Sequence, residues 1–462
     1  MSKTLTQQDI SVLKTGTLGQ IKQMIKPSKM NLKVNKGMSP LHFVCQHNQR
    51  PEILKYLLSK GANPNNQNSH GMNSLHFLCK YSGSSVLIMM LIKKKVQVNS
   101  KTKQKSTALH LLCQYQPNLE SILLLLNSKT KINERDNQGN TILNLICRHN
   151  PDFEIIKALL EKKANPNLKN KKNYLPIHYC CRNSPCMKIL ELLISHDSNL
   201  NLQTEDNLYT ALHFICHYHP RIEFIQLLTQ AGADLSLQSE KGFTPLHLLI
   251  QHCKEFGTIV FLIEFGANVN SRTSQNWNCL HLALKYNPQA QLVENLLQKS
   301  YGINTFNHHN QTPLHLLCFN EEIEDGVVNL LLDYGANVRL ENGKTPLALA
   351  HEENNYAVFK KISDFLELEV GKNYSVKNSK FLKEYSRLEK KLEKVQKEKN
   401  IAEKENNIVQ KETAIFKKQV VTNIKKNISD YNKAIEHNKL LKEKIQQLKK
   451  LQLLKKKQNQ KK

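Results

Sequence analysis

Aliphatic residues recur along this chain with a period of about 34 residues. The repeated position is occupied, in order, by Leu41, Leu75, Leu109, Leu143, Ile177, Leu212, Leu246, Leu280, Leu314 and Leu347. The steps between them are 34 residues long, except for one of 35 and a last one of 33. A constant period of this length predicts a repeat protein, in which each unit buries its apolar face against its neighbours.

Each period predicts two helices that are joined by a break and followed by a polar loop. Two residues before the aliphatic position, every unit but one has a Ser, Thr or Asn, as at Thr107 and Thr244. These residues suit the N-cap of a first helix, because their side-chain oxygens accept hydrogen bonds from the free N–H groups of the first turn. A proline such as Pro117 separates the first helix from the second, and glycines such as Gly61 suit the end of the second helix.

These units resemble ankyrin repeats. The resemblance rests on "SPLH" at 39–42, "TPLH" at 244–247 and 312–315, paired aliphatic residues in the second helix, and the "GANPN" or "GANVN" that follows it. It implies an all-α solenoid of about ten repeats over residues 37–368, preceded by capping helices in residues 1–36. It also implies a protein-binding function without catalysis. The usual unit of the family is about 33 residues long, and the additional residue here falls near the break between the helices.

A His and a Cys three residues apart recur in most of these units. Such a pair could be two metal ligands, or a nucleophile and its base. However, the Cys position is Ile250 and Leu284 in two units, and the His position is Asn144 in another. The pattern therefore requires a hydrophobic residue and a hydrogen-bonding side chain, and in the family this His bonds the backbone of a neighbouring loop. We expect a structural role, with no catalytic residue, no metal and no cofactor.

The sequence shows neither a membrane span nor an export signal. The longest apolar run, "SILLLLN" at 121–127, is far shorter than the roughly 18 residues that a membrane helix needs, and the N-terminus has no apolar stretch behind its charges. We therefore expect a cytoplasmic or nuclear protein whose eleven cysteines are thiols. Cys180 and Cys186 are the candidates for a partly exposed, reactive thiol.

Two rows of side chains are candidates for partner binding. The first row comprises aromatic residues just before the caps of four consecutive units, namely Tyr174, Tyr209, Phe243 and Trp277. The second row follows the Cys position, falls in the family's concave groove, and includes Lys80, Tyr81, Tyr115, Arg148, Arg182, Tyr218, Lys285 and Tyr286. An acidic or phosphorylated protein segment would suit this second row. The alternatives are that the aromatic residues pack on neighbouring loops and that the basic row is only solvated.

A strongly basic region follows a linker at residues 369–379. Residues 371–462 hold 27 Lys and Arg against 10 Asp and Glu, which gives +17 of the chain's net charge of +27. Residues 380–450 contain no Gly or Pro, and their apolar residues follow the 3,4 spacing of a coiled coil. The sequence therefore predicts a long coiled-coil helix, which ends in a Lys-rich tail at 451–462.

Three functions stay open for this basic arm, residues 371–462. It could form a homodimer through residues 380–450, or lie against a partner as a single helix. Its lysines could also contact nucleic acid, an anionic membrane or an acidic filament. Nucleic acid is the weaker of these, because no recognised nucleic-acid-binding fold supports it.

The sequence as a whole predicts a non-enzymatic adaptor or scaffold. Its groove binds a partner protein, and its arm sets the oligomeric state or makes a second contact. The alternative is a protein associated with nucleic acid or the cytoskeleton that binds mainly through the basic arm. The two differ in their response to salt, because binding of a polyanion by the arm weakens steeply as salt rises.

Overall fold

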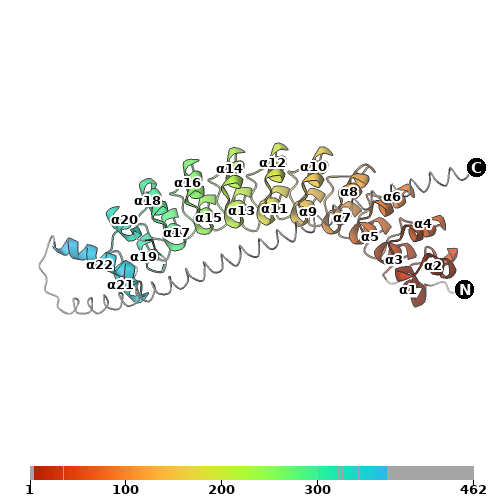
Figure 1. Ribbon diagram of the computed structural model, residues 1–462, viewed down its shortest axis with the longest axis horizontal. Helices are drawn as coiled ribbons and strands as arrows, with labels where there is room; N and C mark the ends of the chain where they lie inside the picture. Colours follow the sequence, from red (N-terminus) through yellow and green to blue (C-terminus); the bar gives the residue numbers. More distant parts are fainter. Residues whose placement is uncertain are drawn as a thin grey trace, which may run out of the picture. The chain divides into compact units, whose positions relative to one another are not determined.

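The fold is described from a computed structural model of the chain (Figure 1). The structure describes residues 5–371, except residues 35, 301, 321, 322, 325 and 342. By its internal contacts the chain divides into residues 1–369 and residues 370–462. The predicted coiled coil at 380–450 and the tail at 451–462 lie outside the described residues, as does most of the linker.

The described residues form a stack of helix pairs and contain no β-strand. The chain begins with α1 (Gln7–Thr15), α2 (Leu18–Met24) and a short 3₁₀ turn, η1 (Pro27–Lys29). The first helices of the following pairs are α3 (Pro40–His47), α5 (Ser74–Tyr81), α7 (Ala108–Tyr115), α9 (Ile142–His149), α11 (Pro176–Asn183), α13 (Ala211–Tyr218), α15 (Pro245–His252), α17 (Cys279–Tyr286), α19 (Pro313–Leu317) and α21 (Pro346–Glu352). The second helices are α4 (Pro51–Ser59), α6 (Ser85–Lys93), α8 (Leu119–Leu126), α10 (Phe153–Glu161), α12 (Met187–Ser195), α14 (Ile222–Gln230), α16 (Phe256–Glu264), α18 (Ala290–Lys299), α20 (Val327–Asp333) and α22 (Tyr356–Gly371).

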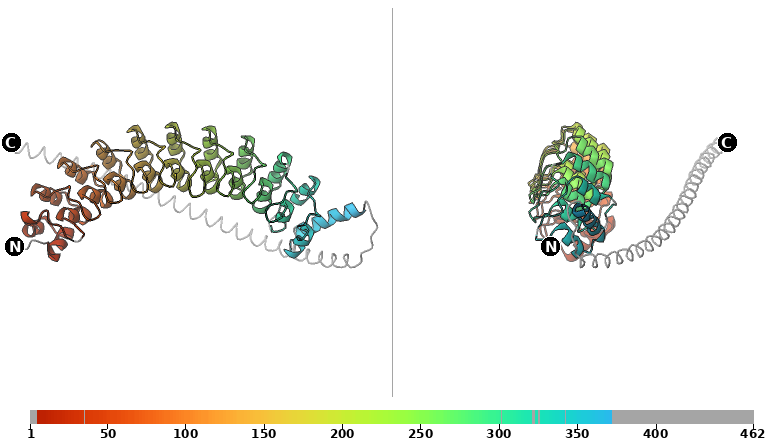
Figure 2. Two further views of the ribbon diagram at one scale, coloured as in Figure 1. Left: turned by 180° about the vertical axis from the view of Figure 1, so that it is seen from behind. Right: turned by 90° about the vertical axis from the view of Figure 1, so that its left-hand side faces the viewer.

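The helices stack in two rows, with first helices on first helices and second helices on second helices. Figures 1 and 2 show the first helices on the inner side of a curved stack and the second helices on its outer side. The helix α1 packs on α3 as α3 packs on α5, so the N-terminal pair continues the stack. The repeated aliphatic residues are buried between the units, with Leu41, Leu75 and Leu246 at 0% exposure, except Leu347 of the last unit, which is half-buried. The predicted all-α solenoid is therefore confirmed.

The N-caps of the first helices follow the sequence prediction in most units. The side chain of Thr107 accepts a hydrogen bond from the backbone N–H of His110 at 3.4 Å, and that of Asn73 accepts from the N–H of His76 at 3.1 Å. Ser39 is an exception, because its buried hydroxyl makes no hydrogen bond. At Ser39 and Leu175 the side chain makes no capping hydrogen bond. The backbone N–H of Ser39 donates to the ring of His42, and that of Leu175 donates to the ring of His178.

Two ladders of hydrogen bonds join neighbouring units along most of the stack. In the hairpin loops, a backbone N–H donates to a carbonyl of the preceding loop, from Ser69 to Lys36 at 2.7 Å through to His308 and Gln275 at 3.0 Å. At the base of the loops, an asparagine side chain donates to the carbonyl just beyond the next second helix, as Asn99 does to Lys129 at 3.1 Å. These ladders fix the hairpin loops relative to the first helices, and so shape the concave side of the stack.

Candidate protein-binding groove

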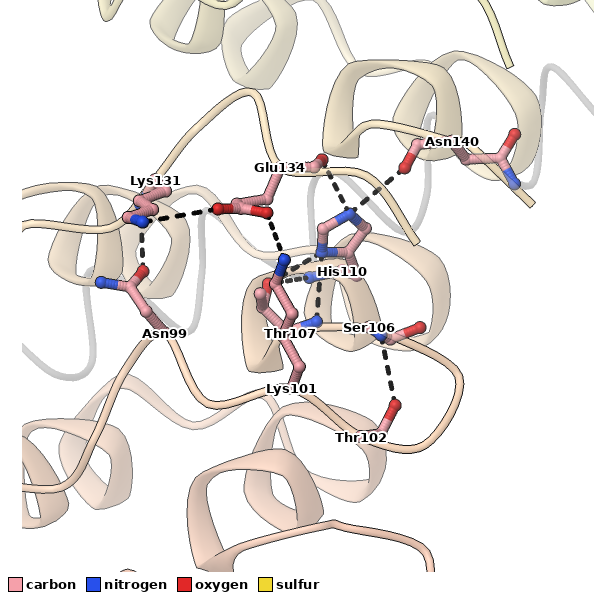
Figure 3. A network of polar contacts seen from close by, with 9 residues as sticks. All are labelled: Asn99, Lys101, Thr102, Ser106, Thr107, His110, Lys131, Glu134 and Asn140. Carbon is pink, nitrogen blue, oxygen red and sulfur yellow. Dashed lines mark hydrogen bonds and ion pairs between the residues drawn. The ribbon is translucent and has the colours of Figure 1, made fainter. Parts of the chain in front are cut away.

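The repeated His residues tie the loops to the first helices. In the unit of Figure 3, the backbone N–H of Thr107 donates to Nδ1 of His110, so the proton of the neutral ring is on Nε2. That nitrogen lies 3.1 Å from the carbonyl of Glu134 and 3.3 Å from the carbonyl of Asn140. Asn144 takes the place of His in the next unit, and its amide donates to the carbonyl of Tyr174 at 3.2 Å. The predicted structural role of this position is confirmed.

Burial keeps these histidines neutral. It lowers the pKa to about 4 for His42, His76, His178, His213, His247 and His281. Their backbone partners offset this lowering only in part. In His42, His178, His213 and His247 a cationic ring would lose the hydrogen bond at Nδ1, because that nitrogen accepts from the backbone N–H of the N-cap residue. The neutral form is therefore part of the stacked structure.

The repeated cysteines are buried thiols. All eleven cysteines are free, as expected, and burial raises the pKa of Cys45 and its equivalents well above the ordinary value. Cys180 is also buried, so the expectation of partial exposure is wrong there, because the residue lies on the packed side of α11. Cys186 is exposed. In the part of the chain that the structure describes, no three His, Cys, Asp or Glu side chains gather as metal ligands.

A groove of about 960 Å³ runs along the concave side from α1 to α9. One wall consists of hairpin-loop residues, including Lys36, His70, Lys103, Gln104 and Asp136. The other wall consists of the C-terminal ends of the first helices, including His47, Lys80, Tyr81, Tyr115, Arg148 and His149. The floor is apolar, with Met38, Phe43, Phe77, Leu111 and Leu145. The structure thus brings together four residues of the predicted second row: Lys80, Tyr81, Tyr115 and Arg148.

Two cations of the predicted second row lie over aromatic rings in the groove. The Nζ atom of Lys80 is 5.3 Å from the ring centre of Tyr81 and 5.1 Å from that of Tyr115. The guanidinium of Arg148 lies 5.6 Å from the ring of Tyr179. Such contacts contribute about 0.5–1 kcal/mol at exposed sites and hold a flexible cation in place. Tyr81 and Tyr115 are 39% and 45% exposed, so their rings stay available to a ligand.

The groove is a positively charged environment. Burial, followed by repulsion from Lys14, lowers the pKa of His47. Burial, followed by repulsion from Arg148, lowers the pKa of His149. Asp136 is the one acidic residue among the lining residues. An anionic ligand would gain from this surplus of positive charge.

The other half of the predicted second row lies outside this groove, further along the stack. Arg182 lies 6.0 Å from the ring of Phe214 and donates to the hydroxyl of Tyr174 at 3.0 Å. Lys285 lies between the rings of Trp277 and Tyr286, at 4.9 and 5.3 Å. Tyr218 is 45% exposed and stacks on Phe214. The same pattern of cations on rings therefore continues, but these residues line no part of the groove.

The first predicted row, of aromatic residues, is less exposed than the sequence suggested. The expectation of exposure is wrong for Tyr174 and Trp277, which are 3% and 8% exposed. Tyr174 packs against Tyr179 and Phe214, and its hydroxyl donates to Asp206 at 3.0 Å.

The side chain of Lys285 covers Trp277, whose indole N–H has no hydrogen-bond partner among the described residues. Tyr209 and Phe243 are half-buried against His213 and His247. Residues of the helix that follows each ring thus cover part of it, and partner binding by this row stays a prediction.

The ankyrin-repeat description "Ankyrin repeats (3 copies)" matches residues 10–102, 75–170, 146–238, 212–307 and 280–370. The overlapping matches cover more than half of the chain. The chain belongs to the ankyrin repeat family. Among solved structures, the stack is similar to the crystal structure of the human ASB11 ankyrin repeat domain, at 23% identity and a TM-score of 0.42, over 50% of this chain and 98% of that one. The comparison with curated proteins finds no match.

Ankyrin repeats are protein-interaction modules, and family members are in general not catalysts. In this ankyrin stack, sequence reasoning missed the floor of the groove. Phe43 and Phe77 follow the motif His in their units. The ring of Phe43 lies 6.0 Å from the Nζ atom of Lys14, and the ring of Phe77 stacks on that of Tyr81. The same period that revealed the His shows this position, but only the structure shows which way it faces. Among the described residues, no helix is long and apolar enough to cross a membrane.

Proposed function

We propose that this protein is an adaptor or scaffold whose groove binds an extended acidic segment of a partner protein. The observation that supports this most strongly is the pairing of Lys80 and Arg148 with aromatic rings in a groove that contains a single carboxylate, that of Asp136. A carboxylate or phosphate on the ligand would form charge-assisted hydrogen bonds with these cations. A Glu-rich or phosphorylated segment therefore fits the groove.

The length of the groove sets the length of the segment. Apart from Lys14 of α1 at one end, it follows the first helices from α3 to α9, which are three steps of roughly 8–10 Å each. An extended chain rises about 3.3 Å per residue, so about eight residues would fill the groove. Tyr81 and Tyr115 offer rings on which the apolar parts of such a segment can pack.

An adaptor needs a second contact, and we infer that the basic arm supplies it. The arm, residues 371–462, has a net charge of +17. Homodimer formation through 380–450, a contact of the arm with a polyanion, and a cytoplasmic or nuclear location stay predictions. Since the groove and the arm are both basic, one acidic partner could bind to both.

The experiment that tests the groove uses the full chain as bait in nuclease-treated extract of the native cell. One variant carries Lys80→Gln and Arg148→Gln. The matched control carries Arg182→Gln and Lys285→Gln, which removes the same charge from the same row outside the groove. Circular dichroism first verifies that both variants are folded.

We expect the groove variant to lose proteins that the control retains, because each lost charge-assisted hydrogen bond costs about 1.5–3 kcal/mol. A Glu-rich peptide of about ten residues should compete for the same proteins. If both variants retain the same set of proteins, the groove is not the binding site and the proposed function is wrong for this surface.

A further inference from the structure

A second surface lies on the outer side of the stack, away from the groove. On the outward face of α6, and at Leu123 of α8, apolar residues stand where neighbouring units have charged residues, while the position of Val86 is the exposed Glu120 in α8. Val86 and Met89 are 56% and 39% exposed. The equivalent residues are Glu52 and Lys55 in α4, and Glu154 and Lys157 in α10, all of them exposed.

The apolar residues of α6 and α8 form one patch, because these two helices pack on each other. Leu123 and Leu124 of α8 are half-buried. They occupy the positions of the repeat that Met89 and Met90 occupy in α6. Glu120 is the only acidic residue in the two helices. We call Val86, Met89, Leu123 and Leu124 the apolar patch.

Exposed lysines border this patch at the C-terminal ends of four second helices. We call them the lysine row: Lys60, Lys93, Lys94, Lys95, Lys129, Lys131, Lys162 and Lys163. Lys93 follows Val86 and Met89 on one face of α6, at the spacing of successive helical turns. Within the described residues, only Lys131 of this row has an acidic partner, Glu134 at 3.7 Å.

Three lysines of the row have an unusual backbone conformation. Lys95, Lys129 and Lys163 are left-handed, with φ of 56°, 62° and 65°. Other units place Gly61, Gly232, Gly266 or Gly335 at this point. A lysine in this conformation is strained where a glycine is not, and the favourable interaction of a cation with a helix C-terminus at most offsets this cost. Stability therefore gives no reason to prefer lysine over glycine at these positions.

The backbone of each of these lysines is also held by the preceding unit. The side chains of Asn65, Asn99 and Asn133 donate to the carbonyls of Lys95, Lys129 and Lys163 at 3.3, 3.1 and 3.2 Å. The three side chains therefore leave the surface in the same direction from three adjacent units. The row ends at the next unit, where Asp197 has the same conformation with the opposite charge.

We propose that the apolar patch and the lysine row together dock on an anionic phospholipid surface. The exposed Val86 and Met89 would pack between headgroups, and the lysines would lie at the level of the phosphates. The negative surface potential of an anionic bilayer attracts each lysine near it, and the combination of apolar insertion with basic charge gives reversible surface binding. A nucleic acid would also attract the lysines, but it would leave Val86 and Met89 with nothing to pack against.

The test measures insertion, because the basic arm could also bring the protein to a vesicle. The full chain with Met89→Trp is mixed with vesicles of phosphatidylcholine with about 30% phosphatidylserine, and with pure phosphatidylcholine. The matched control is Glu191→Trp, at the equivalent point of α12, outside the patch. The buried Trp277 is present in both and contributes the same background.

We expect the emission of the Met89→Trp protein, and not that of the control, to shift to shorter wavelength with anionic vesicles only. Adding Lys95→Gly, Lys129→Gly and Lys163→Gly should raise the lipid concentration for half of this shift about tenfold or more. Because glycine suits the left-handed backbone, this triple variant keeps its fold, so the weaker binding would reflect the lost charges.

Two results would overturn the proposal. In the first, the protein sediments with anionic vesicles while the Met89→Trp emission does not shift, or shifts as much as the control; the arm then accounts for the binding. The second result combines two measurements. The triple lysine variant loses affinity for a duplex oligonucleotide, and a variant with Val86→Ser and Met89→Ser binds vesicles as well as the unchanged protein does. The lysine row would then be a nucleic-acid site.

Discussion

Residues 1–172 and residues 173–370 form the same stack of helix pairs, but they differ in charge. The first region holds 27 Lys and Arg against 8 Asp and Glu, a net charge of +19. The second holds 12 against 21, a net charge of −9. The groove and the lysine row both belong to the basic region. The difference shows that the solvent-facing positions of one architecture can be specialised without change to its interior.

The hydrogen-bond ladder of the hairpin loops continues unchanged across the boundary between the two regions. The N–H of Lys171 donates to the carbonyl of Gln138, and that of Glu205 to the carbonyl of Lys172, both at 2.9 Å. The loop tips themselves change from Lys171 and Lys172 to Glu205 and Asp206. Since backbone atoms make the ladder, it places no restriction on side-chain charge. Four experiments, ordered by expected effect, probe what the regions share and where they differ.

Acid should destabilise both regions by protonating the buried histidines of the first helices. The folded pKa of six of these histidines is about 4, below the usual 6.5, so the unfolded chain binds more protons between these values. The stabilisation is present above pH 6.5 and is lost as the pH falls toward 4, by up to about 3 kcal/mol for each histidine. Thermal melts followed by circular dichroism should show the Tm falling steeply over this range. A constant Tm between pH 7 and pH 4.5 would contradict the account.

Aromatic residues of the two regions should differ in their effect on stability. Trp277→Ala in the acidic region should cost about 3–5 kcal/mol, because the ring is buried. Tyr115→Ala in the groove should cost less than about 1 kcal/mol, because nearly half of that side chain is exposed. Chemical denaturation measures both changes. Equal losses of stability would mean that Trp277 of the first row and Tyr115 of the second row are packed alike.

His213→Ala should cost about 2–4 kcal/mol, because it leaves the N–H of Thr210 and the carbonyl of Phe243 without their partner. His213→Asn should cost less than half as much. The basic region already has an asparagine at the equivalent position. The side chain of Asn144 accepts a hydrogen bond from the N–H of Thr141 at 3.0 Å and donates one to the carbonyl of Tyr174. Denaturation of the two variants side by side tests it, and an Asn variant as unstable as the Ala variant would argue against an exchangeable hydrogen-bonding role.

An exchange at the ends of the second helices should have the smallest effect, about 1 kcal/mol in opposite directions. Lys163→Gly in the basic region should stabilise, because glycine adopts the left-handed backbone without cost. Gly232→Lys in the acidic region should destabilise through its backbone conformation alone, since a Cβ atom added there would have no other atom within 4 Å. Changes of the same sign in a denaturation experiment would show that lysine at this position is not strained.

The sequence predicts the stack well because its determinants repeat. The buried Leu41 position, the N-cap at Thr107 and the structural His110 recur at one period, so chance matches are excluded by repetition. The substitution of His by Asn144 shows what this position requires. The sequence also shows that Leu175 cannot cap its helix through its side chain. In the structure only the backbone N–H of Leu175 makes a hydrogen bond there, to the ring of His178.

The surface is harder to predict, because it depends on contacts between units. Tyr174 and Trp277 occupy loop positions that look exposed, but residues of their own and neighbouring units cover their rings. The groove is lined by residues of several neighbouring first helices and hairpin loops, which no single unit contains. Lys80 and Arg148 line it, while Arg182 and Lys285, in the same row, do not.

The most direct test of the groove is amide hydrogen exchange of the full chain with and without a Glu-rich phosphopeptide of about eight to ten residues. The account predicts slower exchange with peptide in the loops around Lys36, His70 and Lys103 and at the ends of α5, α7 and α9, with little change from α13 to α17. Protection confined to residues 371–462, or spread over the acidic region, would contradict it.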